Sequence, residues 1–378
     1  MLDPHALLRA EQQLEDATGR AVVLTVREEL RAGRVARVNV AGLPVETAIV
    51  KVADPLDPAF DRASLHAEQA ALELLRAVAP HVAPVLLAAE PDRGIVVMED
   101  LGPGPSLADL LRGEDPARAR AGAIAWAQAL GDMHAATAGF ALSHAQRRRA
   151  LSSVDPDADQ LTLRGIHVDD LLARVDEGCR AAGIAPPDDA ASDVAAVRAA
   201  LADPGDLLVL TSGDPCPDNG AVRDDGAVLF DFEVAAFRHA LLDAAHLWLP
   251  FPSCWCWRTL PPGLADELRA AHRERLASRC PSAADPAAHA RAAACATAAW
   301  GLWALARRLG TAATDHGVRP RVLAALDALV GPDVAPALPR LAGWADRARG
   351  ALSARWALEV PVVLPYPAFG GPPLPRPA

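Results

Sequence analysis

The sequence TSGDPCPDNGAVRDDGAVLFDFE, residues 211–233, decides the fold that we predict for this chain. It places Asn219 five residues after Asp214, and Asp231 twelve residues after Asn219. Short apolar runs flank these residues, and Asp224-Asp225-Gly226 between them is typical of a tight hairpin turn. Such a hairpin would bring Asp231 back beside Asn219.

These three residue types have the chemistry that phosphoryl transfer needs. A carboxylate on a loop orients the attacking hydroxyl and accepts its proton, while an amide and a second carboxylate hold Mg²⁺ against the nucleotide phosphates. Asp214 is the candidate for the first role, and Asn219 and Asp231 are the candidates for the second. The alternative is that Asp214 and Asn219 are ordinary turn residues, because Asp-Pro and Asn-Gly pairs both favour turns.

The basic residues give an independent candidate. Of the 37 lysines and arginines, Lys51 is the only lysine. The two residues are interchangeable on a solvated surface, but a tight site that fits a compact ammonium excludes the wider, forked guanidinium. We therefore expect Lys51 to take part in the chemistry, with chance retention of one codon as the alternative.

Composition excludes several classes of function. The 378 residues are 51% apolar and 22% charged, which is typical of a globular protein with two domains or one two-lobed unit. No apolar run approaches the roughly 18 residues of a membrane span, so we expect no membrane partner. The net charge of −11 argues against a nucleic-acid partner, because phosphate backbones require basic patches.

Two further features indicate a cytoplasmic protein. The N-terminal residues 1–16 are charged and amphipathic and lack the apolar core of a secretory signal. The six cysteines show no zinc-site spacing, since only Cys254 and Cys256 are near neighbours in the sequence. We expect all six to be reduced thiols.

Hydrophobic patterning predicts an α+β fold. Residues 1–101 contain three strand-like runs, one helix and two further strands, with Lys51 near the end of the third run. Residues 102–378 are rich in helix, apart from the strands that flank the loop within residues 207–233. The Pro-rich tail from Pro361 onward is expected to be irregular.

These motifs resemble the aminoglycoside phosphotransferase and choline kinase superfamily, the small-molecule relatives of protein kinases. That family has a catalytic loop of the form HGDxxxxN and a following strand that ends in (I/F)D(W/F)E, and this chain has SGDPCPDN and FDFE. The resemblance covers roughly residues 20 to 250 in the same order. It implies a two-lobed fold, with an antiparallel-sheet N-lobe over residues 1–101 and a mainly helical C-lobe over residues 102–378.

The resemblance also implies roles for residues of the N-lobe. Lys51 matches the strand lysine that contacts the α- and β-phosphates of ATP, and Glu68 matches the helix glutamate that pairs with it. The backbone at Glu99 and Leu101 matches the interlobe linker that binds adenine. Gly33 is the only glycine available for a loop that covers the phosphates, and either Arg34 or Arg37 is a candidate to assist it.

The resemblance likewise implies how the C-lobe is used. Asp214 is the catalytic base, Asn219 and Asp231 are the ligands of Mg²⁺, and Asp243 supports the catalytic loop from a following helix. Variable helical segments at residues 140–206 and 244–352 would bind the acceptor. One departure is Ser212, which replaces the family's loop histidine.

The function implied is transfer of the γ-phosphate of ATP to a hydroxyl of a small molecule, in the presence of Mg²⁺. A nucleotide-binding pseudokinase that regulates a partner is the alternative within the fold, and Ser212 favours it. A helical interaction domain with an accidental motif match is the alternative from another class. The acidic charge suggests a cationic acceptor, whereas the identity of the acceptor and the oligomeric state do not follow from the sequence.

For several nearby residues two interpretations stay open. Asp218 is either a turn carboxylate or a substrate contact, and Glu233 is either a neighbour of the metal or a salt-bridge partner. Trp255 and Trp257 are either core anchors or part of the wall of the substrate cleft. We expect His134 to be a packed helix residue rather than a base.

Overall fold

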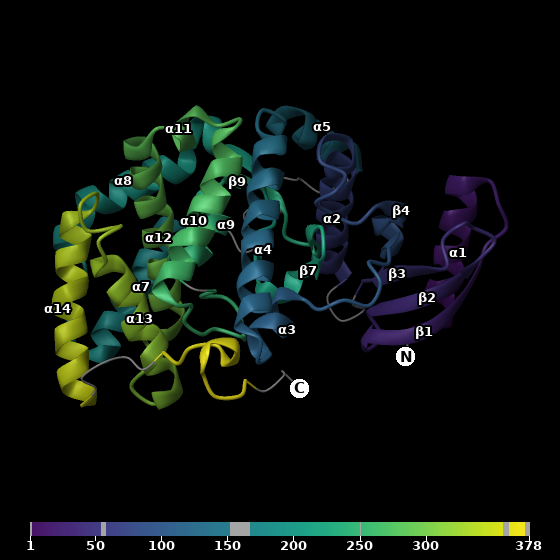
Figure 1. Cartoon of the computed structure of the whole chain (residues 1–378). Helices are drawn as coiled ribbons and strands as arrows, with labels where there is room; N and C mark the ends of the chain where they lie inside the picture. The colour runs from purple at the N-terminus through teal and green to yellow at the C-terminus, as the bar shows by residue number, and fades with distance from the viewer. Residues whose placement is uncertain (1, 54–57, 152–166, 250, 358–362, 375–378) are drawn as a thin grey trace.

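The computed structural model describes residues 2–53, 58–151, 167–249, 251–357 and 363–374. A small sheet with two helices forms one lobe, and a larger, mainly helical lobe lies beside it (Figure 1). The predicted α+β class and the two-lobed arrangement are therefore confirmed. Within the described ranges, no helix is both long enough and apolar enough to cross a membrane.

The N-lobe is built on five antiparallel strands. Their order in the sheet is β1-β2-β3-β5-β4, so the last two strands in the sequence pair with each other and β4 forms one edge. The strands are β1 (Val23–Arg31), β2 (Val35–Ala41), β3 (Thr47–Val52), β4 (Leu86–Glu90) and β5 (Ile95–Glu99). All five agree with the strand-like runs predicted from the sequence.

Alternation along the strands divides the sheet into two faces. On β3, Ala48 and Val50 are buried in a small core of their own, whereas Ile49 and Lys51 lie on the opposite face and line a pocket. Successive side chains of a strand point to opposite faces, so this division follows from the sequence. The alternation therefore places Lys51 on the face that is turned toward the C-lobe.

Two helices cover the two faces, and the sequence predicted only one of them. Helix α2 (Pro58–Val78) carries Glu68 and corresponds to the predicted helix. Helix α1 (Pro4–Thr18) was not predicted; it buries Ala10 and Leu14 in the small core on the other face. The expectation of one helix in the N-lobe is therefore wrong. An apolar face of a sheet is stabilised when another element covers it, because apolar side chains are then removed from water.

The C-lobe is a helical assembly around a single large core. Ser106 caps its first helix through a capping box with Asp109. The helices are α3 (Leu107–Arg112), α4 (Pro116–Thr137), α5 (Ala141–Leu151), α7 (Val168–Ala182), α8 (Ala191–Ala202), α9 (Leu241–Ala244), α10 (Pro262–Ala277), α11 (Pro281–Ala284), α12 (Pro286–Arg308), α13 (Arg319–Val330) and α14 (Pro339–Trp356).

Two short strand pairs interrupt these helices and carry the loop of interest. Strands β7 (Gly220–Arg223) and β8 (Gly226–Leu229) form the predicted hairpin, with Arg223 opposite Gly226. Strands β6 (Leu208–Thr211) and β9 (Ala236–His239) pair on either side of it. Residues 212–219 thus leave one strand pair and enter the other.

The described part of the tail, residues 363–374, is irregular as predicted, yet it is firmly docked. Thr259 exchanges backbone hydrogen bonds with it, donating to Leu364 O at 3.0 Å and accepting from Tyr366 N at 3.3 Å. Tyr366 is completely buried. Its aromatic ring therefore holds the tail against the C-lobe.

Candidate active site

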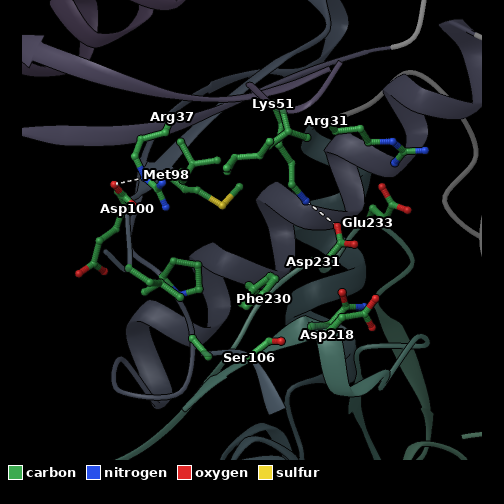
Figure 2. Close-up of a pocket in the computed structure, with 18 of the residues that line it drawn as sticks. Arg31, Arg37, Lys51, Met98, Asp100, Ser106, Asp218, Phe230, Asp231 and Glu233 are labelled. Atoms are coloured by element: carbon green, nitrogen blue, oxygen red, sulfur yellow. Dashed lines mark hydrogen bonds and ion pairs between the residues drawn. The ribbon is translucent and has the colours of Figure 1, made fainter. Parts of the chain in front are cut away.

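A pocket of about 530 Å³ lies between the two lobes (Figure 2). Apolar side chains from β2, β3 and β5 form one wall, and Phe230, which follows β8, lies on the opposite side. Polar residues gather at one end, where Lys51, Asp231 and Glu233 meet. An apolar slot with a charged end suits a flat aromatic base that carries anionic groups.

Lys51 is the centre of the charged end. Its ammonium donates to Glu68 Oε1 at 2.7 Å and to Asp231 Oδ1 at 2.6 Å, so it joins helix α2 to the hairpin of the C-lobe. Burial disfavours the ammonium, but the two carboxylates outweigh this cost and hold the pKa of Lys51 above its usual range. The lysine is therefore charged throughout the physiological pH range.

Negative charge exceeds positive charge at this end of the pocket. Burial raises the pKa of Glu68, although Lys51 opposes the shift. Burial, reinforced by the charge of Asp231, raises the pKa of Glu233 to about 7. Three carboxylates around one ammonium leave an excess that a hard divalent cation with oxygen ligands would neutralise. The donor set therefore fits Mg²⁺. Glu233 lies beside this set and within reach of the charges of Lys51 and Arg31, so its role at the metal stays a prediction.

Asp231 reaches Lys51 through an unusual backbone conformation. Its φ angle is 67°, in the left-handed region where few residues other than glycine are found. Aspartate tolerates this conformation better than most residues, at a cost of about 1–3 kcal/mol. Strain of this kind is common where the position of a side chain matters more than the stability of its loop.

The loop before the hairpin is held by one buried carboxylate. Asp243 accepts hydrogen bonds from the backbone N–H of Ser212 at 2.6 Å and of Gly213 at 3.2 Å, and from Ser212 Oγ at 3.1 Å. The supporting role predicted for Asp243 is thus present. The side chain of Ser212 takes part in the support, so loss of the family's histidine does not leave the loop unbraced.

Gly213 can only be glycine. Its φ angle is 75°, and a Cβ atom there would lie 2.6 Å from Val234 O and 2.7 Å from Arg238 Nη1. Arg238 is itself fixed, because it donates to Thr211 Oγ1 and Val234 O. The backbone just ahead of Asp214 is therefore closely packed on its far side.

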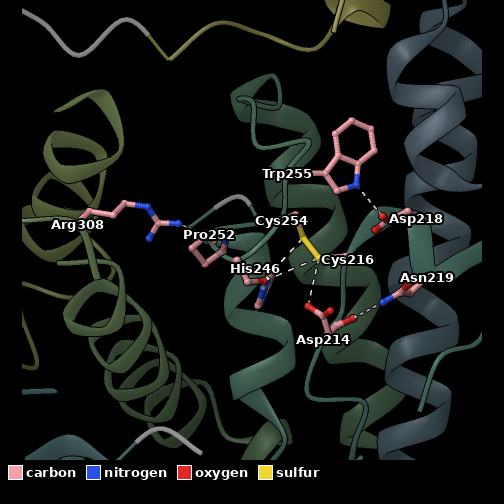
Figure 3. The surroundings of a disulfide bond; sticks show 10 residues. Asp214, Cys216, Asp218, Asn219, His246, Pro252, Cys254, Trp255 and Arg308 are labelled. Atoms are coloured by element: carbon pink, nitrogen blue, oxygen red, sulfur yellow. Dashed lines mark hydrogen bonds between the residues drawn. A yellow bond between two sulfur atoms is a disulfide. The ribbon is translucent and has the colours of Figure 1, made fainter. Parts of the chain in front are cut away.

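Asp214 and Asn219 of this loop lie close to each other (Figure 3). Asn219 donates its side-chain N–H to Asp214 O at 2.9 Å, which leaves its Oδ1 atom as the acceptor that can face a cation. Asn219, Asp218 and Asp231 line the pocket, whereas Asp214 is placed beyond its lining. The structure thus places Asn219 and Asp231 at the pocket and Asp214 away from it.

The linker between the lobes also lines the pocket. Glu99 and Leu101 both border it, and Leu101 O accepts a hydrogen bond from Arg223 at 2.9 Å. Their contact with adenine stays a prediction. Arg37 donates to Asp100 Oδ2 at 2.8 Å. Partial burial would raise the pKa of Asp100, but hydrogen bonds to its carboxylate, with that from Arg37 the largest, hold the pKa below its usual range. Arg37 therefore braces the linker, and because it also lines the pocket, its role at the phosphates stays a prediction.

Gly33 lies in a tight turn rather than in a loop over the pocket. Its φ angle is 68°, and Arg34 N donates to Arg31 O at 3.0 Å to close the turn between β1 and β2. Arg31 and Arg34 line the pocket but Gly33 does not. A role for Gly33 at the phosphates stays a prediction, and the two arginines are the closer groups.

The APH model of the phosphotransferase enzyme family matches residues 27–281, which include every element of this site. The chain belongs to that family. No curated protein gave a match.

Several solved structures resemble the phosphotransferase. A choline/ethanolamine kinase family protein from Mesorhizobium loti is 16% identical, with a TM-score of 0.47, over 89% of this chain and 99% of that one. An ethanolamine kinase from Plasmodium vivax is 12% identical, with a TM-score of 0.46, over 82% of each chain. The streptomycin–ATP complex of APH(2″)-IIa is 13% identical, with a TM-score of 0.44, over 88% of this chain and 98% of that one. None of these likenesses identifies a substrate of this phosphotransferase.

Beside the loop of residues 212–219, the phosphotransferase contains a feature that the sequence interpretation missed. Cys216, in this loop, forms a disulfide with Cys254, 38 residues later (Figure 3). The expectation that all six cysteines are reduced is therefore wrong for this pair. The spacing argument considered neighbours in the sequence, whereas this pair is brought together by the fold.

The aromatic segment approaches the loop beside this disulfide. Trp255 Nε1 donates to Asp218 Oδ2 at 2.7 Å, and the guanidinium of Arg112 lies 5.6 Å from the centre of the Trp255 ring. Trp257 is nearly fully buried and lies under Arg321. Trp255 thus lies beside the loop and packs against the large core, and Trp257 is a packed residue.

Buried histidines complete the support of the loop. His134 is completely buried, as predicted; it contacts His272 at 3.0 Å and lies 3.6 Å from Asp243 Oδ2. Burial lowers the pKa of His246 to about 4 and the pKa of His272 well below its usual value. His246 and His272 are therefore neutral imidazoles in this cluster. Only His134, of these three, was marked by the sequence, through its place in the helix before the loop.

Proposed function

We propose that this phosphotransferase transfers the γ-phosphoryl group of ATP to a hydroxyl group of a small molecule, with Mg²⁺. The observation that carries the proposal is the position of Lys51, whose ammonium joins Glu68 and Asp231 at the charged end of the pocket. Such a bridge holds a lysine where it can neutralise phosphate oxygens while the lobes keep their relative position. Among 37 basic residues, the one lysine stands at this point.

On this proposal, the residues of the pocket share the binding of the nucleotide. The adenine ring lies between the apolar side chains and the linker at Glu99 and Leu101. Lys51 contacts the phosphates, and Asn219 and Asp231, assisted by Glu233, hold Mg²⁺. The metal ion supplies positive charge to the phosphate oxygens when it is bound.

Asp214 is the proposed catalytic base. Its loop is held by Asp243, and its carbonyl group accepts from Asn219, so the carboxylate has a defined place next to the metal ligands. From the C-lobe side it would orient the acceptor hydroxyl and accept its proton as the new bond to phosphorus forms. Asp214 lies outside the lining of the nucleotide pocket, while Asp218, which lines it, stands at the border between the donor and acceptor sides.

A nucleotide-binding pseudokinase is the second candidate, and Ser212 is the observation in its favour. However, Ser212 and Gly213 are both bonded to Asp243, which supports an ordered and active loop. Heating the protein with and without MgATP would test nucleotide binding, because a ligand of the native state raises its stability. Steady release of ADP, dependent on a hydroxyl acceptor, separates the kinase from the pseudokinase.

For the acceptor we propose a small molecule that carries a positive charge. Asp218 supports this: Trp255 holds its Oδ2 atom, while its Oδ1 atom is buried and accepts no hydrogen bond from the described residues. A buried carboxylate oxygen without a donor is costly, and an ammonium group would satisfy it. The ring face of Trp255 is already covered by Arg112, so the carboxylate is the better partner for the cation.

Asp218→Asn tests the acceptor class. We expect KM to rise about 10-fold or more for amine-bearing acceptors, because a hydrogen bond to a charged group is lost, and to change little for neutral sugars. Asp224→Asn, in the exposed turn of the hairpin, is the matched control. Equal effects of Asp218→Asn on charged and neutral acceptors would contradict the cationic class but leave the kinase activity standing. The cytoplasmic location stays a prediction.

A further inference from the structure

The Cys216–Cys254 disulfide connects the catalytic loop to the aromatic segment at residues 251–257 (Figure 3). Cys216 follows the proposed base by two residues, and its sulfur lies 3.3 Å from Asp214 Oδ1. Both half-cystines are nearly inaccessible, with exposed fractions of 6% and 2%. The other four cysteines are free thiols buried elsewhere in the described chain. The cross-link therefore lies directly beside the proposed catalytic base, Asp214.

On the loop side, residues 215–217 are buried, and the backbone hydrogen bonds of Cys216 stay within the loop. Two prolines, Pro215 and Pro217, flank Cys216 and have no N–H groups to donate. The Cys216 amide donates back to Asp214 O at 2.7 Å, which is a contact within the loop. Asp243 braces only Ser212 and Gly213, ahead of the base. The disulfide is thus the covalent attachment of this stretch to the rest of the C-lobe, beside the hydrogen bond from Trp255 to Asp218 and the packing of residues 215–217.

On the other side, the disulfide partner lies in a segment that is itself well anchored. Arg308 donates to Pro252 O at 2.9 Å, and His246 Nε2 lies 3.2 Å from Ser253 Oγ. Immediately after Cys254, Trp255 donates to Asp218. The cross-link therefore ties the base to the same segment that holds the acceptor-side carboxylate.

We propose that the Cys216–Cys254 disulfide is a positioning element for the acceptor half of the site, and that a dithiol reductant lowers turnover by opening it. The inference rests on the proposed kinase function. Reduction transfers two electrons and two protons from the dithiol: the S–S bond breaks, two protein thiols form, and the reductant becomes a disulfide. The nucleotide half, with Lys51, Glu68 and Asp231, touches neither sulfur.

The reduced state affects the base in two ways. Without the cross-link, the stretch around Cys216 is free to move relative to Trp255 and Asp218. In addition, the new thiol of Cys216 lies beside Asp214 and can donate to its carboxylate, in competition with the acceptor hydroxyl. A displacement of about 1 Å at a reacting group can cost roughly 100-fold in rate. Turnover should therefore fall, while binding of MgATP should not.

The test compares the oxidised wild type with the double variant Cys216→Ser/Cys254→Ser. We expect kcat to fall about 10-fold or more in the double variant, with KM for MgATP within about twofold of the wild type. Reduction of the wild type with dithiothreitol should give the same loss, and reoxidation should restore the activity. Dithiothreitol should leave the double variant unchanged. Cys295→Ser is the matched control, because Cys295 is a buried free cysteine in the middle of α12, and this variant should behave as the wild type.

Each outcome has a defined meaning. Peptide mass spectrometry that finds free thiols at both positions in air-oxidised protein would overturn the proposal, as would equal kcat in the oxidised and reduced forms. If the double variant does not fold, the reduction and reoxidation of the wild type decides the question alone. If the oxidised wild type neither binds MgATP nor releases ADP with any acceptor, the kinase function has failed instead. A merely structural bond would lower stability without the selective loss of kcat.

Discussion

The two halves of the proposed site are held together by different kinds of interaction. On the nucleotide side, Lys51 and Glu68 lie on a regular strand and a regular helix, and ion pairs of 2.6 and 2.7 Å join the lysine to Asp231 and Glu68. The amide of Asn219 and the carboxylate of Asp231 lie at the two ends of the β7–β8 hairpin. On the acceptor side, a disulfide, an indole and a buried carboxylate hold an irregular loop. The geometry of the first half therefore depends on charge, and the geometry of the second half depends on a covalent bond and on packing.

This difference indicates how each half would fail. Removing a charge from the nucleotide side unbalances a cluster that already contains more carboxylates than ammonium groups, so binding suffers first. Disturbing the acceptor side moves a correctly charged group away from its place, so turnover suffers first. Substitutions on each side should therefore give opposite patterns in kcat and in nucleotide affinity.

The sharpest test of the comparison sets Asp214→Asn against Asp231→Asn. We expect Asp214→Asn to lower kcat about 1,000-fold or more with nearly unchanged affinity for MgATP, because only the acceptor's proton loses its base. Asp231→Asn removes a charged oxygen from the cation site and should weaken MgATP binding itself. Calorimetric titration of both variants measures the affinities. Equal losses of affinity would break the division between the two halves.

Lys51→Arg should have the next largest effect. The guanidinium keeps the charge but is too wide and forked for a place between Glu68, Asp231 and the phosphates, so we expect kcat/KM to fall about 100-fold. Arg93→Lys, an exposed residue paired with Glu90, is the control for exchanging the two basic types. If Lys51→Arg keeps more than about half of the wild-type kcat/KM, a loss of only about 0.4 kcal/mol, the assignment of Lys51 is wrong.

Gly213→Ala probes the packing of the acceptor side. The new Cβ meets the Val234 carbonyl and the Arg238 guanidinium, and alanine is strained at φ 75° in any case. We expect a destabilisation of about 2–3 kcal/mol together with a fall in kcat, because the loop ahead of Asp214 must shift. Gly205→Ala is the matched control, since φ is 59° there and the site for the Cβ is open. Equal denaturation midpoints for the two variants would show that the contacts around Gly213 are unimportant.

The smallest effect per group is the acid response of the buried histidines. Burial lowers the pKa of His239 and of His246 to about 4, so these groups stay neutral in the fold but are protonated in the unfolded chain below about pH 6.5. Their contribution to stability is therefore present above pH 6.5 and is lost as the pH falls toward 4. Each group should lower the free energy of unfolding by about 1.4 kcal/mol per pH unit in that range.

Urea denaturation at pH 7 and pH 5 measures this response. His239→Gln should show a shallower dependence on pH than the wild type, because one of the titrating groups is gone. A free energy of unfolding that is constant between these two pH values would contradict the assignment of neutral histidines to the C-lobe core.

The nucleotide side was largely predictable, and the reason is local. Asp214, Asn219 and Asp231 stand within 18 residues of one another, and a hairpin of known turn chemistry brings the ends together. Lys51 was marked by composition and by the alternation of β3. These signals need only short-range geometry, which a sequence expresses directly.

The acceptor side was not predictable in the same way. Cys216 and Cys254 are joined across 38 residues, and nothing in their spacing distinguishes them from the four free cysteines. Helix α1 was missed because its apolar stripe of Ala10 and Leu14 is narrow and rich in alanine. Such features depend on which surfaces meet after folding.

The ion pair of Lys51 makes this protein convenient to observe. Because the chain has one lysine side chain in 39.5 kDa, isotope labelling of lysine alone would give a single ammonium signal, and that signal would come from the nucleotide side of the site. Its chemical shift would report occupancy of the pocket directly, without assignment of any other resonance.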